Sequence, residues 1–348
     1  MIERKARRAQ VLVSAPYLLP VLDSFRPELE RAGLDLTVAP VVERLSAAEL
    51  LGYAGQVDGV ACGDDEFDGA TLRAFAPRLK VISKWGTGID SIDSPTAREL
   101  GIEVFNTPGA FTDAVADSVL GYILAFARGQ PWMDRALKDG GWEKVGGRSL
   151  AECTLGVVGV GRIGRAVLLR AHSFGMPLYG NDVVPIAPSF LHRCGVRMVS
   201  LKELVRRSDF ISLNCDLNPT SHHLIDAAIL REMKPSAVVI NTARGPVVDE
   251  PALVAALAGS LIAGAALYVF EAEPLPLDSP LRREARVLLG AHNANSSPAA
   301  WARVHRSTLR NLLRGLGLEL PASLREPRPP TERAPGFMAR ATGRRQKR

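Results

Sequence analysis

Short apolar runs alternate with stretches of helical periodicity through the N-terminal third of the chain. The runs of strand length are Val11–Ala15, Leu36–Ala39, Val57–Cys62 and Lys80–Lys84. Segments with helical spacing lie between these runs, and Gly33 stands where the first of those helices should end. This alternation of strand and helix predicts a parallel sheet with helices on both faces.

The alternation begins again after a long apolar helix predicted over Thr112–Arg128. The glycine-containing stretch Gly129–Ser149 that follows is predicted to be irregular, and an amphipathic helix is predicted over Pro298–Leu316. The chain is therefore predicted to be α/β, with two doubly wound parallel sheets. Between those segments, the runs of strand length are Leu155–Val158, Leu178–Asn181, Phe210–Asn214, Ala237–Asn241, Gly264–Val269 and Val287–Leu289.

The two arrays divide the chain into two predicted domains. A length of 348 residues supports the division, since a single core rarely grows beyond about 250–300 residues. We predict that residues 1–110 and 297–320 form one discontinuous domain and that residues 111–296 form the other. Residues 321–348 are Pro-rich and poor in apolar side chains, so we predict a disordered basic tail.

The positive charge of the chain lies in this tail. The net charge is +6, and the segment from Pro321 onward carries eight basic and two acidic residues, so the predicted globular part has no excess positive charge. We therefore expect no specific nucleic-acid partner, although a basic tail can touch nucleic acid or anionic lipid nonspecifically.

The sequence shows no membrane span, no signal peptide and no metal-binding pattern of cysteines. No apolar run approaches the roughly 20 residues that span a bilayer, and the segment Met1–Arg8 has no apolar region of a signal peptide. No membrane contact and a cytoplasmic location are expected. The four cysteines have no metal-ligand spacing, so we expect reduced thiols and no metal site.

A glycine-rich turn separates the predicted strand Leu155–Val158 from the predicted helix after it. Gly159 permits a tight turn, Gly161 lets the backbone approach a pyrophosphate, and Gly164 lets helix and strand pack closely. Backbone N–H groups at the helix start, at Arg162 and Ile163, would face the phosphates. The sequence therefore predicts a dinucleotide site, the alternative being a glycine turn without a ligand.

An acidic residue completes this pattern. Asp182 ends the next strand about 20 residues further on, where a carboxylate accepts hydrogen bonds from the adenosine ribose. Val183 and Val184 offer no cation for a 2′-phosphate, which favours NAD over NADP as the cofactor.

Three polar residues suited to carbonyl chemistry follow other predicted strands. Arg244 can hold a carboxylate through two parallel hydrogen bonds. His292 can give a proton to a carbonyl near neutral pH, and Glu273 can stabilise its imidazolium. Ligands of open α/β sheets bind at the carboxyl ends of the strands, and all three residues are predicted to lie at that edge of the sheet. The alternative roles are a structural ion pair for Arg244, a surface acid for Glu273 and a loop histidine for His292.

The chain resembles the D-isomer-specific 2-hydroxyacid dehydrogenases, the family of D-3-phosphoglycerate dehydrogenase, D-lactate dehydrogenase and hydroxypyruvate reductase. The family's fold pairs a flavodoxin-like substrate domain with a Rossmann NAD-binding domain. The residues that carry the resemblance are Gly86–Asp93, Asn106–Gly109, the Gly159–Gly164 turn, Met233–Pro235, Asn241–Gly245 with Val247–Asp249, Phe270–Pro274 and His292.

The resemblance implies a role for each matching residue. Arg244 would bind the substrate carboxylate and carbonyl, and His292 would be the acid/base with Glu273 as its partner. The loop Trp85–Gly88 would offer backbone N–H groups to the carboxylate, while Thr242 and Ala243 would line the nicotinamide side. The implied substrate loop comprises Trp85, Gly86, Thr87 and Gly88.

The resemblance also implies an assembly and a domain arrangement. The stretch Gly129–Ser149 would help to form a homodimer. The helices at 112–128 and 298–316 would link two domains that close over a small 2-hydroxy or 2-keto acid.

One position departs from the family pattern. Tyr268 stands where the family usually has an Asp that holds the nicotinamide carboxamide. A catalytically weakened, NAD-binding regulatory protein similar to the family's corepressor branch is therefore the alternative to an enzyme. A formate dehydrogenase-like protein is disfavoured, because that group carries a long N-terminal extension.

The substrate stays open among phosphoglycerate, hydroxypyruvate, glyoxylate and other short 2-keto acids. The loop after the third strand contains Asp64, Asp65 and Glu66, which would repel a phosphate if they faced the cleft. Lys84 and Asn106 could still bind a substrate phosphate.

Overall fold

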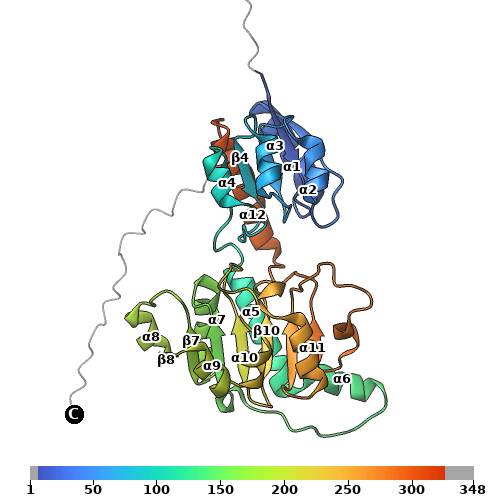
Figure 1. The fold of residues 1–348 in the computed structure, drawn as a ribbon, viewed down its shortest axis with the longest axis vertical. Helices are drawn as coiled ribbons and strands as arrows, with labels where there is room; N and C mark the ends of the chain where they lie inside the picture. The colour runs from blue at the N-terminus through green and yellow to red at the C-terminus, as the bar shows by residue number, and fades with distance from the viewer. Residues whose placement is uncertain (1–6, 326–348) are drawn as a thin grey trace, which may run out of the picture.

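The computed structural model describes residues 7–325, which form two α/β domains, one above the other in Figure 1. A five-stranded sheet has the order β2-β1-β3-β4-β5, and a seven-stranded sheet has the order β12-β11-β10-β9-β6-β7-β8. All strand pairs in both sheets are parallel. These orders are those of a flavodoxin-like and a Rossmann domain, which confirms the predicted fold class.

The first sheet is buried between two helical layers. Helices α1 and α12 cover one face, and α2, α3 and α4 cover the other. The short strand β5 was not predicted, because three residues with an exposed Glu103 show no apolar run. The elements of this domain are β1 (Ala9–Val13), α1 (Leu22–Arg31), β2 (Leu34–Val38), α2 (Ala47–Leu50), β3 (Gly59–Cys62), α3 (Gly69–Phe75), β4 (Val81–Lys84), α4 (Ser94–Glu99), β5 (Glu103–Phe105) and α12 (Pro298–Gly315).

The second sheet is covered in the same way. Helices α5, α7 and α8 pack on one face, and α9, α10 and α11 pack on the other. Its elements are α5 (Thr112–Arg128), α6 (Gln130–Lys138), β6 (Leu155–Val158), α7 (Arg162–Ser173), β7 (Leu178–Asn181), α8 (Pro188–Cys194), β8 (Val196–Met198), α9 (Leu201–Arg207), β9 (Phe210–Leu213), α10 (Ala227–Arg231), β10 (Val238–Asn241), α11 (Glu250–Ala258), β11 (Gly264–Leu267) and β12 (Val287–Leu289).

Helix α12 carries the chain back from the second domain to the first (Figure 1). Its apolar residues Val304, Leu309 and Leu312 are fully buried at helical spacing, and the helix packs on β3, β4 and β5. The chain continues on this domain beyond the helix. Ala322–Leu324 form a 3-10 helix, and Leu324 is only 1% exposed.

The predicted start of the tail at residue 321 is therefore wrong. Leu324 is buried against the first domain and keeps the segment around it ordered, although the composition of that segment had predicted disorder. The remainder of the predicted tail, residues 326–348, lies outside the described residues.

The stretch predicted to be irregular contains helix α6. Gly129 adopts a left-handed conformation with φ +61° and ends α5, and Pro131 lies in the first turn of the new helix. Trp132 of α6 donates a hydrogen bond to the Ala285 carbonyl at 2.7 Å. After the helix, Trp142 is 81% exposed. This segment projects from the side of the second domain (Figure 1).

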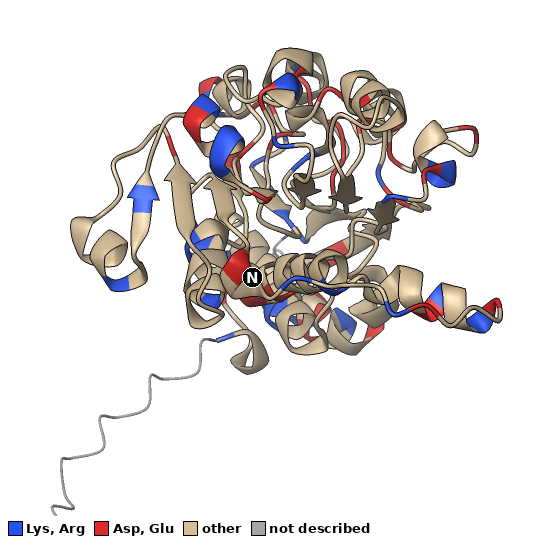
Figure 2. Ribbon diagram, turned by 90° about the horizontal axis from the view of Figure 1, so that it is seen from below, with Lys and Arg blue, Asp and Glu red and all other residues tan. Residues whose placement is uncertain are grey.

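Basic and acidic residues are interspersed along the helices in Figure 2. Within residues 7–325, no helix combines the length and apolar composition needed to cross a membrane.

Candidate active site

A cleft lies where the carboxyl ends of strands from both sheets face one another. Residues after β1, β3 and β4 line it from the first domain, and residues after β10, β11 and β12 line it from the second. Each of these loops follows a strand, so the two sheets fix the positions from which the side chains project. The residues that line the cleft include Tyr17, Glu43, Asp64, Lys84, Trp85, Gly86, Thr87, Gly88, Ile163, Thr242, Arg244, Tyr268, His292 and Asn295.

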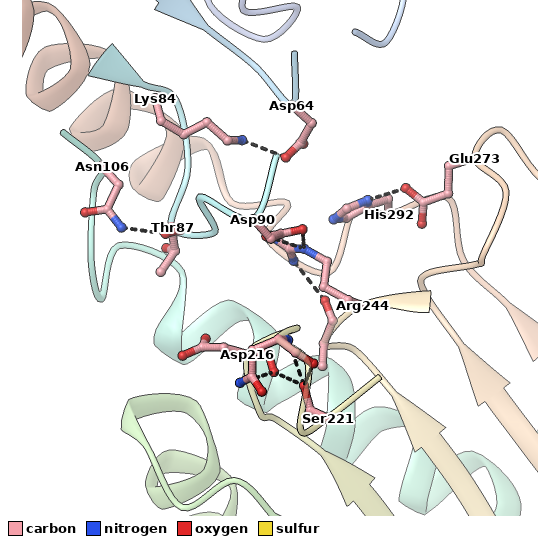
Figure 3. Close-up of polar contacts among 12 residues, drawn as sticks. Asp64, Lys84, Thr87, Asp90, Asn106, Asp216, Ser221, Arg244, Glu273 and His292 are labelled. Carbon is pink, nitrogen blue, oxygen red and sulfur yellow. Dashed lines mark hydrogen bonds and ion pairs between the residues drawn. The ribbon is translucent and has the colours of Figure 1, made fainter. Parts of the chain in front are cut away.

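His292 and Glu273 form a pair on one side of the cleft (Figure 3). Nδ1 of His292 lies 2.8 Å from Oε2 of Glu273, while Oε1 of Glu273 accepts the backbone N–H of Phe270 at 2.9 Å. The imidazole is thus held through Nδ1, which leaves Nε2 as its free nitrogen. His292 also has φ +47°, a conformation that non-glycine residues rarely adopt and that is common at functional sites.

The surroundings of His292 favour its protonated form. Burial opposes the charge, but the hydrogen bond and the negative charge of Glu273, with a further contribution from Asp64, raise the pKa of His292 above its usual value. The imidazole therefore keeps its proton to higher pH than a histidine free in solution.

Arg244 extends towards the cleft from the loop after β10 (Figure 3). Its Nε donates to both carboxylate oxygens of Asp90, at 3.1 and 3.2 Å, and Nη1 donates to the Ala243 carbonyl at 2.8 Å. A Cβ added at Gly88 would overlap the Arg244 guanidinium. The position of Arg244 therefore requires Asp90 as its anchor and a glycine at position 88.

The loop Trp85–Gly88 forms the wall opposite His292. Its start is fixed by the backbone N–H of Trp85, which donates to the Cys62 carbonyl, and by Trp85 Nε1, which donates to Nδ1 of His305 at 2.9 Å. Within residues 7–325, the backbone N–H groups of Gly86, Thr87 and Gly88 have no hydrogen-bond partner. The loop thus presents three donors, while Trp85 contributes its ring to the wall.

Asn106 is placed behind this loop, outside the residues that line the cleft. Its side-chain amide donates to the Thr87 carbonyl at 2.5 Å (Figure 3). The neighbouring Thr107 donates to the Gly86 carbonyl from both its backbone and its hydroxyl at 2.8 Å. Asn106 therefore stabilises the conformation of the Trp85–Gly88 loop.

Lys84 is buried, and its ammonium lies 2.7 Å from Asp64 (Figure 3). Despite burial, Lys84 and Arg244 lower the pKa of Asp64 to about 2. Of the three acids in this loop, only Asp64 lines the cleft. Asp65 points inward and binds Ser14 and the Leu45 backbone, and Glu66 pairs with Arg44.

The glycine turn at the start of α7 has the close contacts that its sequence predicts. Gly159 has φ +85°, and a Cβ there would overlap the backbone between Asn214 and Cys215. A Cβ at Gly164 would overlap the Gly159 carbonyl, whereas one at Gly161 would meet no atom within 4 Å. Within the described part of the chain, no side chain caps α7, which leaves the N–H groups of its first turn available to a ligand.

The remaining residues of the predicted dinucleotide site fit the same group. Asp182 accepts backbone N–H groups from Val160 at 2.6 Å and Val184 at 2.8 Å, and its carboxylate retains lone pairs for further donors. The Arg162 side chain reaches Gly109 of the first domain, and Ile163 lines the cleft. These residues fit a dinucleotide whose phosphates lie at the α7 N-terminus.

Tyr268 lines the cleft, and its ring packs between Tyr122 of α5 and Gly290. The Tyr122 and Tyr268 ring centroids are 5.0 Å apart, and a Cβ at Gly290 would overlap the Tyr268 ring. Burial and the neighbouring Tyr268 hydroxyl raise the pKa of Tyr122. The structure thus accommodates a large ring where the resembled family has a carboxylate.

Several cleft residues were not identified from the sequence. Tyr17 follows β1 and stacks on Trp85 with ring centroids 4.8 Å apart, and Glu43 follows β2 at the edge of the cleft. Asp90 was noted only as part of a motif. A systematic search of the residues after each predicted strand would have found Tyr17 and Glu43, because all these loops meet at one edge.

Comparison with known proteins identifies relatives over most of the chain. Residues 120–294 match the family described as D-isomer specific 2-hydroxyacid dehydrogenase, NAD binding domain. A glyoxylate reductase of Thermofilum pendens is 40% identical over 292 residues, covering 80% of this chain and 84% of that protein. A D-3-phosphoglycerate dehydrogenase of Methanocaldococcus jannaschii is 42% identical over 229 residues, covering 65% and 43%.

A similar fold occurs in a solved structure, D-lactate dehydrogenase from Aquifex aeolicus complexed with NAD and lactic acid. That chain is 25% identical, has a TM-score of 0.80, and is matched over 95% of its length and 88% of this one.

Proposed function

Because the chain belongs to the D-isomer-specific 2-hydroxyacid dehydrogenase family, we propose that it uses NADH to reduce short 2-keto acids that carry no charged group besides the carboxylate, giving D-2-hydroxy acids. NAD-dependent oxidoreduction of a 2-hydroxy acid is the activity of the family, and NAD is the cofactor. The convergence of Arg244, the His292–Glu273 pair and three free backbone donors on one cleft carries the proposal.

Each group would perform one step at the substrate. Arg244 and the N–H groups of Gly86, Thr87 and Gly88 bind the carboxylate and orient the keto carbonyl. His292 Nε2 donates a proton to the carbonyl oxygen, and Glu273 stabilises the imidazolium before the transfer. When bound, the dinucleotide supplies the hydride. In the oxidation direction, His292 accepts the proton.

The cofactor would be held by the residues around α7. Gly159, Gly161, Arg162, Ile163 and Gly164 would bind the pyrophosphate, and Asp182 would bind the adenosine ribose. Thr242, Ala243 and Tyr268 would border the nicotinamide. Val183 is 91% exposed beside Asp182 and supplies no cation, which supports NAD over NADP.

The charges in the cleft support a substrate without a second anionic group. The Lys84 ammonium, the charge best placed to meet a phosphate, is already paired with Asp64. Glu43 adds a carboxylate at the cleft edge with no hydrogen bond among residues 7–325. Burial is the main cause that raises the pKa of Glu43, His292 opposes the shift, and Glu273 and Asp64 add to it. Glyoxylate and hydroxypyruvate therefore fit better than phosphohydroxypyruvate.

The proposal is tested by NADH oxidation with a substrate panel at neutral pH. Glyoxylate, hydroxypyruvate, pyruvate, 2-ketoglutarate and phosphohydroxypyruvate are compared by kcat/KM. We expect the first two to be the best substrates. A preference for phosphohydroxypyruvate would refute the substrate class, and turnover with none of the five would refute the activity.

Replacing Glu43 by lysine should raise the kcat/KM for phosphohydroxypyruvate relative to hydroxypyruvate by about tenfold. The change replaces a repulsive charge by an attractive one, and a partly exposed pair at ~4 Å interacts by about 1–4 kcal/mol. The ratio of the two kcat/KM values in the variant and the parent is the measurement. Glu49→Lys, an exposed α2 position outside the cleft, is the control and should leave the ratio unchanged.

Replacing Glu273 by glutamine should shift the pH profile of keto-acid reduction. Glu273 raises the pKa of His292, so its neutral substitute lowers that pKa. Reduction needs protonated His292, so kcat/KM falls as pH rises through this pKa, and the fall should occur at lower pH in the variant. The oxidation profile should shift in the same direction, gaining activity at lower pH. An unchanged profile would contradict the role of Glu273.

The comparisons do not support the alternative of a regulatory NAD-binding protein. The relatives described above are named as a reductase and dehydrogenases.

A homodimer and a cytoplasmic location are also proposed. The projecting segment around α6 exposes Trp142 and Val145, which supports an interface between two copies. Sedimentation of the purified chain tests the dimer, and a monomeric mass would refute it.

A further inference from the structure

Two side chains in the cleft wall each bury an oxygen atom that has no hydrogen-bond partner among residues 7–325. These atoms are Thr242 Oγ1 and Asn295 Oδ1. A buried polar atom without a partner is unfavourable, and most such atoms in proteins are paired. Two unpaired oxygens in one cleft therefore indicate a ligand group that offers complementary hydrogen-bonding atoms.

The positions of these residues identify the part of the cleft to which they belong. Thr242 lies two residues before Arg244, and Asn295 lies three residues after His292. The hydride and the proton add to the same carbonyl group, so the nicotinamide ring must lie beside the atoms that His292 and Arg244 hold. Thr242 and Asn295 thus belong to the two loops that carry Arg244 and His292, and both residues line the cleft.

Tyr268 is not the carboxylate acceptor that the family resemblance implies at this position. The Tyr268 ring is packed against Tyr122, and Gly290 provides the space for it. A tyrosine hydroxyl at the end of this ring cannot reproduce a carboxylate at the Cβ of the same residue. A side-chain acceptor for a carboxamide NH₂ would therefore come from another residue of the wall.

We propose that Asn295 and Thr242 bind the nicotinamide carboxamide, replacing the acidic residue absent from position 268. Asn295 Oδ1 accepts a hydrogen bond from the carboxamide NH₂, and the Thr242 hydroxyl donates one to its carbonyl oxygen. The two contacts fix the rotation of the ring and hence the face presented to the substrate. The inference rests on NAD binding and is independent of the substrate class proposed above.

Calorimetric titration with two reduced cofactors tests each contact separately. NADH carries the carboxamide, whereas its 3-acetylpyridine analogue keeps the carbonyl and replaces the NH₂ by a methyl group. Asn295→Ala should weaken NADH binding about three- to tenfold and leave analogue binding within about twofold. Thr242→Val should weaken both cofactors by a similar factor, because both retain the carbonyl.

Two further variants separate this role from a structural one. Asn293→Ala changes an exposed residue of the same loop and should leave both affinities unchanged. Asn295→Asp keeps an acceptor oxygen and should retain the preference for NADH, including if Asn295→Ala fails to fold. Equal losses for both cofactors in a folded Asn295→Ala protein would overturn the proposal, as would unchanged NADH affinity with an increased KM for the keto acid. Absence of keto-acid turnover would leave these binding constants measurable.

Discussion

Replacing His292 by alanine is expected to lower kcat for keto-acid reduction by about 10²- to 10⁴-fold, the usual contribution of a positioned acid or base. The variant loses the proton donor at Nε2 but none of the contacts around the α7 turn. NADH affinity should therefore change by less than about threefold. Steady-state kinetics with hydroxypyruvate and calorimetric titration with NADH measure the two quantities.

His172→Ala is the matched control for this prediction, because His172 is exposed on α7 and does not line the cleft. The control should retain the parent kcat. A parent-like kcat in His292→Ala would show that solvent or another group supplies the proton.

Replacing Arg244 by alanine should lower kcat/KM by about 10²- to 10⁴-fold, with most of the loss in KM if binding the carboxylate is its main role. The change removes two charge-assisted hydrogen bonds, worth roughly 1.5–3 kcal/mol each. Arg244→Lys should recover only part of the loss, since a lysine keeps the charge but cannot form two parallel hydrogen bonds or keep the Nε contact with Asp90.

The control is Arg98→Ala, an exposed arginine at the end of α4. Initial rates over a range of keto-acid concentrations separate kcat from KM. An Arg244→Ala protein with parent-like kcat/KM would leave the backbone N–H groups of the Trp85–Gly88 loop as sufficient for carboxylate binding.

The architecture could be predicted from the sequence because buried parallel strands leave continuous apolar runs. The glycine turn, Asp182 and the residues after β10, β11 and β12 were found by the same reasoning, since parallel strands bring their carboxyl ends to one edge. The elements that were not predicted, β5 and α6, have only weak local signals in the sequence. Strand β5 is too short to form an apolar run, and α6 depends on how Gly129 ends the preceding helix.

The orientation of individual side chains could not be predicted. Asp64 and Asp65 are adjacent, yet one faces the cleft and the other the protein interior, because successive residues of an extended segment point to opposite sides. The contact between Arg244 and Asp90 joins residues 154 positions apart. Tyr268 could be recognised as a departure, but the space that Gly290 gives its ring is visible only in three dimensions.

The return of α12 to the first domain has a consequence for synthesis on the ribosome. One apolar face of the N-terminal sheet is completed only by residues near the end of the described chain, including Val304, Leu312 and Leu324. The second domain contains its own core within a continuous segment and can fold earlier. The domain translated first is thus the last to be finished, and its nascent form exposes a hydrophobic face until the final helix emerges.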